Sequence, residues 1–439
     1  MPENLDGSVL GLILECQHEI RQTLRDWRSP DWVIYPLDVL VMVILVARLC
    51  GCVTHDDVVS FYRRRYLELY ALIDGMPGPE HRLSPVTVKR VLTMLSAGEV
   101  DGLLRNRFAT VRSALLEMMT ECGEQRERPE EASRHTLAFD GQECTDSFVR
   151  GESSRRRKCA SGVTVFNCTL KTVLSSKAVK KKNNEAGAFI HMMSGLDIRG
   201  TVVMADALNS RAEVSAAIIG HGADYCLNIK KNAGNKELLS HLEGLFNRDS
   251  APGEKSEAIE LSHGEKGYGR IDQWKIEVLP AFKLDPRIKN PHVKTVTLIR
   301  YTRISVNIRN GRETKVTENT RYYVSSLSFS RENAMQILYS ILDYWAVEQH
   351  HARLDDERVF NQDSTQSCDF DYLSSVFGIN KIVFNILSYI RQDKISKSQS
   401  KRHPSFSAVQ DILNSKRLSH VFRYIAMYYL GSEAGQKQA

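Results

Sequence analysis

Short apolar segments of strand type alternate with helical segments between residues 136 and 229, and this alternation constrains the fold more than any other feature. The expected strands are Thr136–Phe139, Val163–Thr169, Thr172–Val179, Thr201–Ala205 and Tyr225–Ile229, and the expected helices are Ala186–Leu196 and Ala212–Gly220. Strands that alternate with helices are typical of an α/β sheet with helices on its faces. The sequence therefore predicts an α/β core.

Three other regions surround this core. Helical spacing of apolar residues runs from Val9 to about residue 122, and the polar segment 123–133 predicts a domain boundary. β signals dominate from about residue 253 to 327, and Leu338–Arg353 and Ala408–Tyr429 are helical again. We therefore expect a helical N-terminal domain at 1–130, a core at 131–232 and 328–392, a β-rich insertion at 233–327, and a basic helical C-terminal tail at 393–439.

The cysteines and the apolar segments of the sequence argue against a zinc protein, a disulfide-linked secreted protein and a membrane protein. The chain has nine cysteines, and none of them is spaced as in a zinc site, so reduced thiols and a cytosolic location are expected. The longest apolar run, Val39–Ala47, is far shorter than the roughly 20 residues of a membrane span. It predicts a buried helix, and no membrane partner or signal peptide is expected.

Positive charge is concentrated in one segment. Arg150–Lys182 holds ten lysines and arginines against one acid, whereas the whole chain has a net charge of only +6. Such a patch is typical of a phosphate-backbone binder, although a solvated loop is the alternative. Lys89 and Arg90 lie in a helix that Ser84 and Pro85 begin. This helix could read DNA bases, or it could be a plain surface helix.

Three acidic residues suggest a catalytic site. Asp140 and Asp206 each follow an apolar strand, and Glu348 lies in a helix. Ligands of open α/β sheets bind beyond the carboxyl ends of the strands. Three converging carboxylates would suit Mg²⁺ or Mn²⁺, and two such ions can clamp the oxygens of a phosphodiester displacement. Taken singly, an aspartate at a strand end is more often a turn or cap residue.

Several short segments, in one order, resemble the H-repeat-associated (ISAs-type) insertion-sequence transposases of bacteria, a branch of the DDE superfamily. The segments are Tyr35–Leu40 with Cys50–Cys52, Phe139–Gly141, Lys182–Glu185, Met204–Ala207, Gly222–Tyr225, Ile229–Asn232, Tyr268–Ile271, Tyr322–Leu327 and Trp345–Glu348. The resemblance spans about residues 28–389. It implies a ribonuclease-H-like catalytic core with a β-strand insertion, preceded by an all-helical N-terminal domain.

The resemblance also implies an activity. Asp140, Asp206 and Glu348 would be the catalytic acids and would hold Mg²⁺ or Mn²⁺, as two ions, for DNA strand cleavage and strand transfer at insertion-sequence ends. The expected partners are double-stranded DNA, both transposon ends and target, and a second copy of the chain in a bacterial cytoplasm. The basic residues expected to contact DNA are Lys89, Arg90, Arg155, Arg156, Arg157, Lys158, Lys180, Lys181, Lys182, Lys230 and Lys231.

The sequence also departs from the family around the third acid. After Glu348 the family has Asn and then Leu-His-Trp, whereas Gln349, His350 and His351 follow here. The histidine pair would lie either on a helix surface or near the metals or a DNA phosphate. The departures keep two rival functions open: a domesticated DNA-binding protein derived from a transposase, and a nuclease that cuts without joining.

Overall fold

The fold is taken from a computed structural model of the chain. It describes residues 7–105, 129–143, 161–180, 185–206, 210–231, 234–249, 258–267, 269–309, 312–355, 359–362, 367, 369–396 and 404–430. The expected DNA contacts Arg155, Arg156, Arg157, Lys158, Lys181 and Lys182 lie outside these residues.

One continuous mixed sheet holds the strands together, in the order β3-β2-β1-β4-β5-β9-β8-β7-β6. The bounds are β1 Thr136–Glu143, β2 Ser161–Asn167, β3 Thr172–Val179, β4 Val202–Ala205, β5 Asp224–Ile229, β6 Ile259–Gly267, β7 Arg270–Pro280, β8 Thr297–Arg309 and β9 Arg312–Ser325. Strands β1 to β3 form an antiparallel meander, while β4 pairs parallel to both β1 and β5. The α/β core predicted from the alternation is confirmed, and five of its strands match the predicted segments to within four residues at either end.

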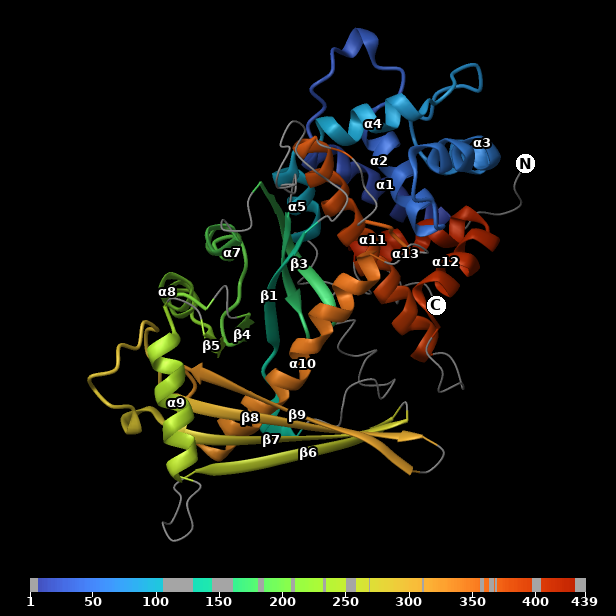
Figure 1. Ribbon diagram of the computed structural model, residues 1–439. Coiled ribbons are helices and arrows are strands. Elements are labelled where there is room, and N and C mark those ends of the chain that lie inside the picture. The colour runs from blue at the N-terminus through green and yellow to red at the C-terminus, as the bar shows by residue number, and fades with distance from the viewer. Residues whose placement is uncertain are drawn as a thin grey trace, which may run out of the picture.

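Helices cover both faces of this sheet. On one face lie α7 (Glu185–Met193), α8 (Ala212–Gly220) and α9 (Lys236–Asp249), whose apolar side chains form a core with the inward residues of the central strands. On the other face lie α10 (Arg331–Asp355) and α11 (Phe370–Ser396) (Figure 1). Helix α10 therefore passes over the strands that carry the two aspartates.

The region expected as a β-rich insertion continues the core sheet. Strand β9 pairs antiparallel with β5, so β6 to β9 extend the core sheet beyond its fifth strand. The region also contains helix α9, which the β-rich pattern did not predict. Strands β8 and β9 pair along nearly their whole length, and residues 310 and 311 between them lie outside the described part of the chain.

The remaining helices form a second layer. They are α1 (Gly7–Thr23), α2 (Leu37–Leu49), α3 (His55–Leu72), α4 (Pro85–Met94), α5 (Ala97–Arg105), α12 (Phe406–Ser415) and α13 (Leu418–Leu430). Local signals explain where two of them begin: Thr54 and Asp57 form a capping box for α3, and the Ser84 hydroxyl accepts a hydrogen bond from the Thr87 N–H at the start of α4. Helix α2 is buried along its whole length, as its apolar composition predicts.

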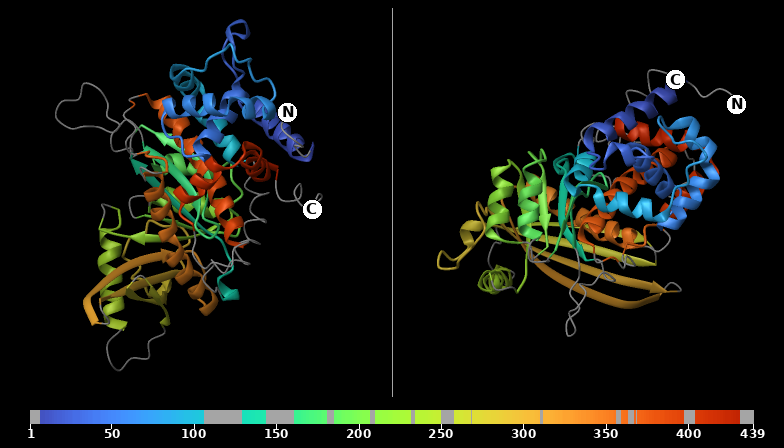
Figure 2. Two further views of the ribbon diagram at one scale, coloured as in Figure 1. Left: turned by 90° about the vertical axis from the view of Figure 1, so that its right-hand side faces the viewer. Right: turned by 90° about the horizontal axis from the view of Figure 1, so that it is seen from above.

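The C-terminal segment differs from the expected tail. The helix predicted at Ala408–Tyr429 is two helices, and Val409, Leu418 and Phe422 are buried in the same core as the N-terminal helices. The first and last described helices, α1 and α13, pack against each other in this layer (Figure 2). The reason is that α12 and α13 each have an apolar face, and α1 to α3 offer the nearest apolar surface to cover it.

Helix α11 contains a long apolar segment that the search for the longest apolar run did not find. Within the described residues, its segment Phe370–Lys394 is long and apolar enough to cross a membrane by length and composition. Every residue of the tested window is nevertheless buried by the rest of the protein. The helix packs between the meander strands and the helical layer, so its apolar character on all sides is explained by burial within the fold.

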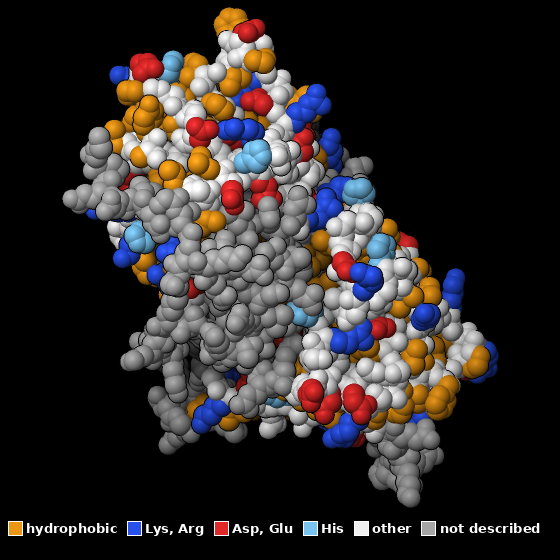
Figure 3. Space-filling view, turned by 180° about the vertical axis from the view of Figure 1, so that it is seen from behind, with side chains coloured by type: hydrophobic (Ala, Val, Ile, Leu, Met, Phe, Trp, Pro, Cys, Tyr) orange, Lys and Arg blue, Asp and Glu red, His pale blue; other side chains and the backbone are white. Residues whose placement is uncertain are grey.

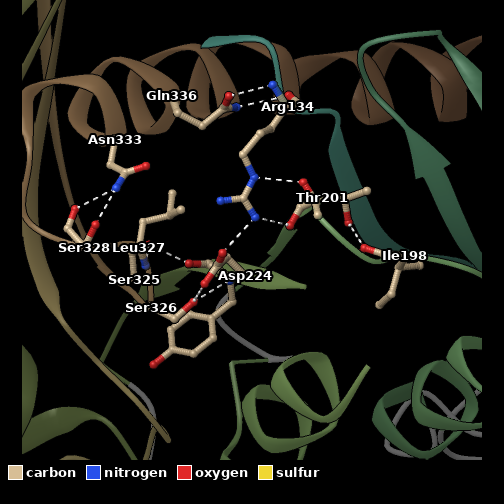
Figure 4. A network of polar contacts seen from close by, with 12 residues as sticks. Arg134, Ile198, Thr201, Asp224, Ser325, Ser326, Leu327, Ser328, Asn333 and Gln336 are labelled. Atoms are coloured by element: carbon tan, nitrogen blue, oxygen red, sulfur yellow. Dashed lines mark hydrogen bonds and ion pairs between the residues drawn. The ribbon is translucent and has the colours of Figure 1, made fainter. Parts of the chain in front are cut away.

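A polar network ties α10 to the N-terminal ends of the central strands β1, β4 and β5 (Figure 4). The Gln336 side chain both accepts from the Arg134 N–H (2.9 Å) and donates to the Arg134 carbonyl (3.1 Å). The Arg134 guanidinium donates to the carbonyls of Gly200 and Thr201 and to the Asp224 carboxylate (2.7 Å). The side chains of Gln336 and Arg134 together thus fix α10 against the starts of β1, β4 and β5, and with it the position of Glu348 farther along the helix.

Candidate active site

Asp140 and Asp206 are brought together by the pairing of two parallel strands. Phe139 of β1 lies opposite Ala205 of β4, so the aspartates that follow them are neighbours at the same point of the sheet. Asp206 follows the last residue of β4, as expected. Asp140 does not end its strand, because β1 continues to Glu143 through its pairing with β2. The strand-end prediction is therefore wrong for Asp140, but parallel pairing still places it beside Asp206.

Glu348 reaches the same site from α10. Its charge and the charges of Asp206 and Glu185 all raise the pKa of Asp140. Partial burial raises the pKa of Glu348 itself, while the nearby cations Arg321 and Lys230 act in the opposite direction. The fold therefore places the three acids within electrostatic reach of one another, although they lie far apart in the sequence.

Glu185 is a fourth carboxylate at this site, and the sequence analysis did not assign it a role. It is the first residue of α7, is only 3% exposed, and accepts a hydrogen bond from the Ser161 hydroxyl at 3.4 Å. Its carboxylate lies so close to Gly141 that a Cβ there would overlap it. The available signal was an acid just before the predicted helix Ala186–Leu196, within the segment Lys182–Glu185.

Burial and crowding together change the ionisation of Asp140. Desolvation is the main cause, the charge of Asp206 comes next, and together with Glu185 and Glu348 they raise the pKa of Asp140 to about 7. The Gly141 N–H opposes this shift by donating to Asp140 Oδ1 at 2.9 Å. The shift shows that the site concentrates negative charge in a place poorly reached by water.

The histidine pair of α10 is not on a surface, so that interpretation is wrong. His350 is fully buried, with its ring stacked on Phe166 and edge-on to Phe384. His351 lies beside the acids, with Nδ1 3.4 Å from Asp140 Oδ2. Burial lowers the pKa of His351 to about 3, so a neutral imidazole meets the Asp140 carboxyl group. The second interpretation, a histidine near the acidic site, therefore describes His351.

Carboxylate oxygens suit Mg²⁺ or Mn²⁺, and a cation would relieve the repulsion that raises the pKa of Asp140. The closely spaced carboxylates of this site are therefore chemically suited to a divalent metal ion. In the described residues, however, no three side chains of His, Cys, Asp or Glu are grouped closely enough to hold a metal ion. The acids of this site would have to draw together to share one.

The described basic residues lie in three places. Lys230 and Lys231 are exposed directly after β5, and the charge of Lys230 opposes the rise that burial causes in the pKa of Glu348. Lys180 is exposed at the end of β3, with its ammonium 5.1 Å from the centre of the Phe370 ring. Lys89 and Arg90 are exposed on α4, in the helical layer at the opposite end of the molecule from β6 to β9 (Figure 1).

On the face seen from behind, basic side chains do not gather in one patch. Lysines and arginines are interspersed there with acids over the part of the surface that the structure describes (Figure 3). The fold therefore brings Lys230 to the acidic site, whereas Lys89 and Arg90 lie in the helical layer (Figure 1).

Comparison with known proteins supports the resemblance. The chain is 23% identical over 384 residues to two proteins of Escherichia coli K12, the putative protein YbfL and the H repeat-associated putative transposase YhhI, covering 86% of this chain and 90% of each relative. It is also 23% identical over 371 residues to the putative transposase YncI of Escherichia coli O157:H7, covering 82% of this chain and 84% of that protein.

Two other comparisons are less informative. No protein-family model matches the chain. A piggyBac transposase synaptic complex with hairpin DNA, solved by cryo-EM, aligns over 94% of this chain and 78% of its own, with 11% identity and a TM-score of 0.38. That score is too low to indicate a shared fold. The relatives YhhI and YncI match most of the chain and are named putative transposases, which supports a transposase of the H repeat-associated type.

Proposed function

We propose that the chain is a DDE transposase that cleaves DNA strands at insertion-sequence ends and transfers them to a target, with Asp140, Asp206 and Glu348 as its catalytic acids. The observation that carries this proposal is the assembly of those three acids from β1, β4 and α10 into one electrostatically coupled site. The similarity to transposases over most of the chain supports the same activity.

The proposal includes a ribonuclease-H-like core. An antiparallel meander of three strands, followed by two parallel strands that are each reached through a helix, is compatible with such a core. In this arrangement the first two acids come from adjacent parallel strands, and the third comes from a helix that crosses the sheet. Catalytic side chains on rigid elements of this kind can be held in a fixed relative geometry.

Asp140, Asp206 and Glu348 would hold two Mg²⁺ or Mn²⁺ ions, which when bound would supply charge stabilisation for the attacking and leaving oxygens. Glu185 adds a negative charge close to Asp140, and its carboxylate packs against Gly141. His351 presents a neutral ring to Asp140 and limits the access of water to it. The protein's own part in catalysis would be positioning and electrostatics, without a covalent bond to DNA.

The remaining partners follow from this activity. Double-stranded DNA, as transposon ends and as target, would be the substrate, and two copies of the chain would pair the two ends. Lys230 and Lys231 lie where they could contact DNA at the acids, while Lys89 and Arg90 on α4 could contact it farther away. A bacterial cytoplasmic location goes with this function.

The test is an assay with a labelled element end, a target plasmid and Mg²⁺. The proposal expects a joined product from the wild-type protein, and no cleavage from Asp140→Asn, Asp206→Asn or Glu348→Gln. Glu332→Gln, at the exposed start of the same helix α10, is the matched control and should retain activity. Each inactive variant should still bind DNA, because the acids and the basic side chains have separate tasks.

The same assay separates the rival functions. Cleavage without joining would identify a nuclease, and a stable uncut complex in the presence of Mg²⁺ or Mn²⁺ would identify a DNA-binding protein derived from a transposase. Full strand transfer by the Glu348→Gln variant would show that the third acid has been wrongly assigned.

A further inference from the structure

Two cations lie on neighbouring strands beside Glu348. The pairing of β5 with β9 ends at Ile229 opposite Tyr322, so Lys230 and Arg321 are the next residues along the two strands. Arg321 lies against the ring of Trp345, which is one helical turn from Glu348 in α10, and Lys230 lies beside Arg321 where the β5–β9 pairing ends. The chain therefore places two positive charges at the edge of a site that otherwise holds carboxylates.

Trp345 holds one of these cations in place. It precedes Glu348 by three residues in α10, so the two side chains lie on the same side of the helix. The centre of its ring is 5.9 Å from the Arg321 guanidinium carbon and 5.3 Å from that of Arg303. Such cation–π contacts contribute about 0.5–1 kcal/mol each at exposed sites and restrict where a guanidinium can point.

The two arginines at Trp345 differ in their ion pairing. Arg303 is bound to the Asp272 carboxylate, with Nη2 3.2 Å from Oδ1. Arg321 donates from Nε to the neutral amide oxygen of Asn319 at 3.3 Å. Among the described residues no carboxylate lies within ion-pairing distance of Arg321 or Lys230. Within the described part of the chain, these two cations therefore have no carboxylate partner, and they can bind an anion from outside the protein.

A site of clustered carboxylates repels the phosphates of a DNA strand. A phosphodiester can approach Asp140 and Glu348 only where positive charge offsets this repulsion, at close range and on a defined side. Lys230 and Arg321 supply such charge from the β5–β9 side, and the guanidinium can bind a phosphate through two parallel hydrogen bonds.

We propose that Lys230 and Arg321 form a subsite for one phosphate of a DNA strand next to the acidic site, and that Trp345 is a positioning residue that orients Arg321. This inference rests on the proposed function, because it assumes that DNA is the substrate of the acids. It adds Arg321 and Trp345 to the residues that handle the DNA strand.

The experiment measures binding of the full chain to a short fluorescent duplex without added metal, over a range of salt concentrations. Each lost phosphate contact makes the slope of log affinity against log salt shallower by roughly 0.9, so the double variant Lys230→Gln with Arg321→Gln, which loses one phosphate, should have a slope shallower by up to about 0.9. The matched control is Lys289→Gln, which removes an exposed cation in the loop before β8. It should change the slope by less than about 0.5.

The role of Trp345 is tested by a double-mutant cycle. If Trp345 acts through Arg321, then Arg321→Gln should weaken binding much less in the Trp345→Leu background than in the wild type. Trp345→Phe retains an aromatic face and should keep most of the affinity. Equal losses from Arg321→Gln in both backgrounds would show that Trp345 has only a structural role and would overturn this part of the proposal.

The outcomes separate the two proposals. A wild-type protein that binds and cleaves DNA, with an unchanged salt slope in the Lys230/Arg321 double variant, would overturn the phosphate subsite and leave the proposed function intact. A wild-type protein that binds no duplex would overturn both. Arg321→Lys retains the charge, so it should preserve the slope, and its thermal unfolding should match that of Arg321→Gln if folding is unaffected.

Discussion

Replacing Asp140 by asparagine should stabilise the metal-free protein at high pH. The pKa of Asp140 is raised from 3.8 to about 7, so the folded state holds a proton between these values that the unfolded state has lost. Stability from this group is fully present below about pH 3.8 and is lost as the pH rises through about 7. Asparagine has the same shape and carries no charge, so it removes this loss.

The size of the effect follows from the shift. A rise of about three pKa units corresponds to about 4 kcal/mol of lost stability well above pH 7. The entropy of unfolding is about 2 cal/mol/K per residue, which for 439 residues is about 0.9 kcal/mol/K if the chain unfolds as one unit. Asp140→Asn should therefore raise the melting temperature by about 4–5 °C at pH ~8, and by much less at pH ~5.

The assay is calorimetric unfolding of wild type and variant across this pH range in the presence of a chelator. Asp411→Asn, which removes an exposed carboxylate on α12, is the control and should give no such pH-dependent difference. Mg²⁺ should then raise the melting temperature of the wild type more than that of Asp140→Asn, because ligand binding stabilises the folded state. A variant that melts at or below the wild-type temperature at pH ~8 would refute the reasoning that crowded carboxylates destabilise this site.

Three further changes test the packing around the site. Gly141→Ala should lower the free energy of unfolding by about 1–3 kcal/mol because its Cβ would displace the Glu185 carboxylate. Adding Glu185→Ala to this variant should restore most of the lost stability, as measured by unfolding in urea. Arg134→Met should lower stability by about 1–3 kcal/mol, since it removes the partly exposed ion pair with Asp224 and two bonds to backbone carbonyls; an unchanged urea midpoint would contradict this role. His350→Phe should increase the free energy of unfolding by about 1–3 kcal/mol and raise the melting temperature. The reason is that both His350 ring nitrogens are buried without a hydrogen-bond partner among the described residues. A lower melting temperature would mean that the larger ring does not fit.

Sequence periodicity and local capping determined the positions of many elements. Thr172–Val179 and Ala212–Gly220 were predicted with the bounds that β3 and α8 have. Such elements are encoded locally, because alternation, helical spacing and cap residues act over a few neighbouring positions. Asp140, Asp206 and Glu348 were also recognisable in the sequence, two of them next to strands and all three within segments that resemble one family.

The tertiary structure decided which of these elements and residues meet. The parallel pairing of β1 with β4 set Asp140 beside Asp206 even though β1 continues past the aspartate. The packing of α7 on the sheet added Glu185, and the register of β5 with β9 added Arg321. These contacts depend on strand register and on the layering of helices, which join positions too distant in sequence for any local pattern to encode. The same reason explains the C-terminal helices, whose apolar faces were readable but whose partner, the N-terminal helical layer, was not.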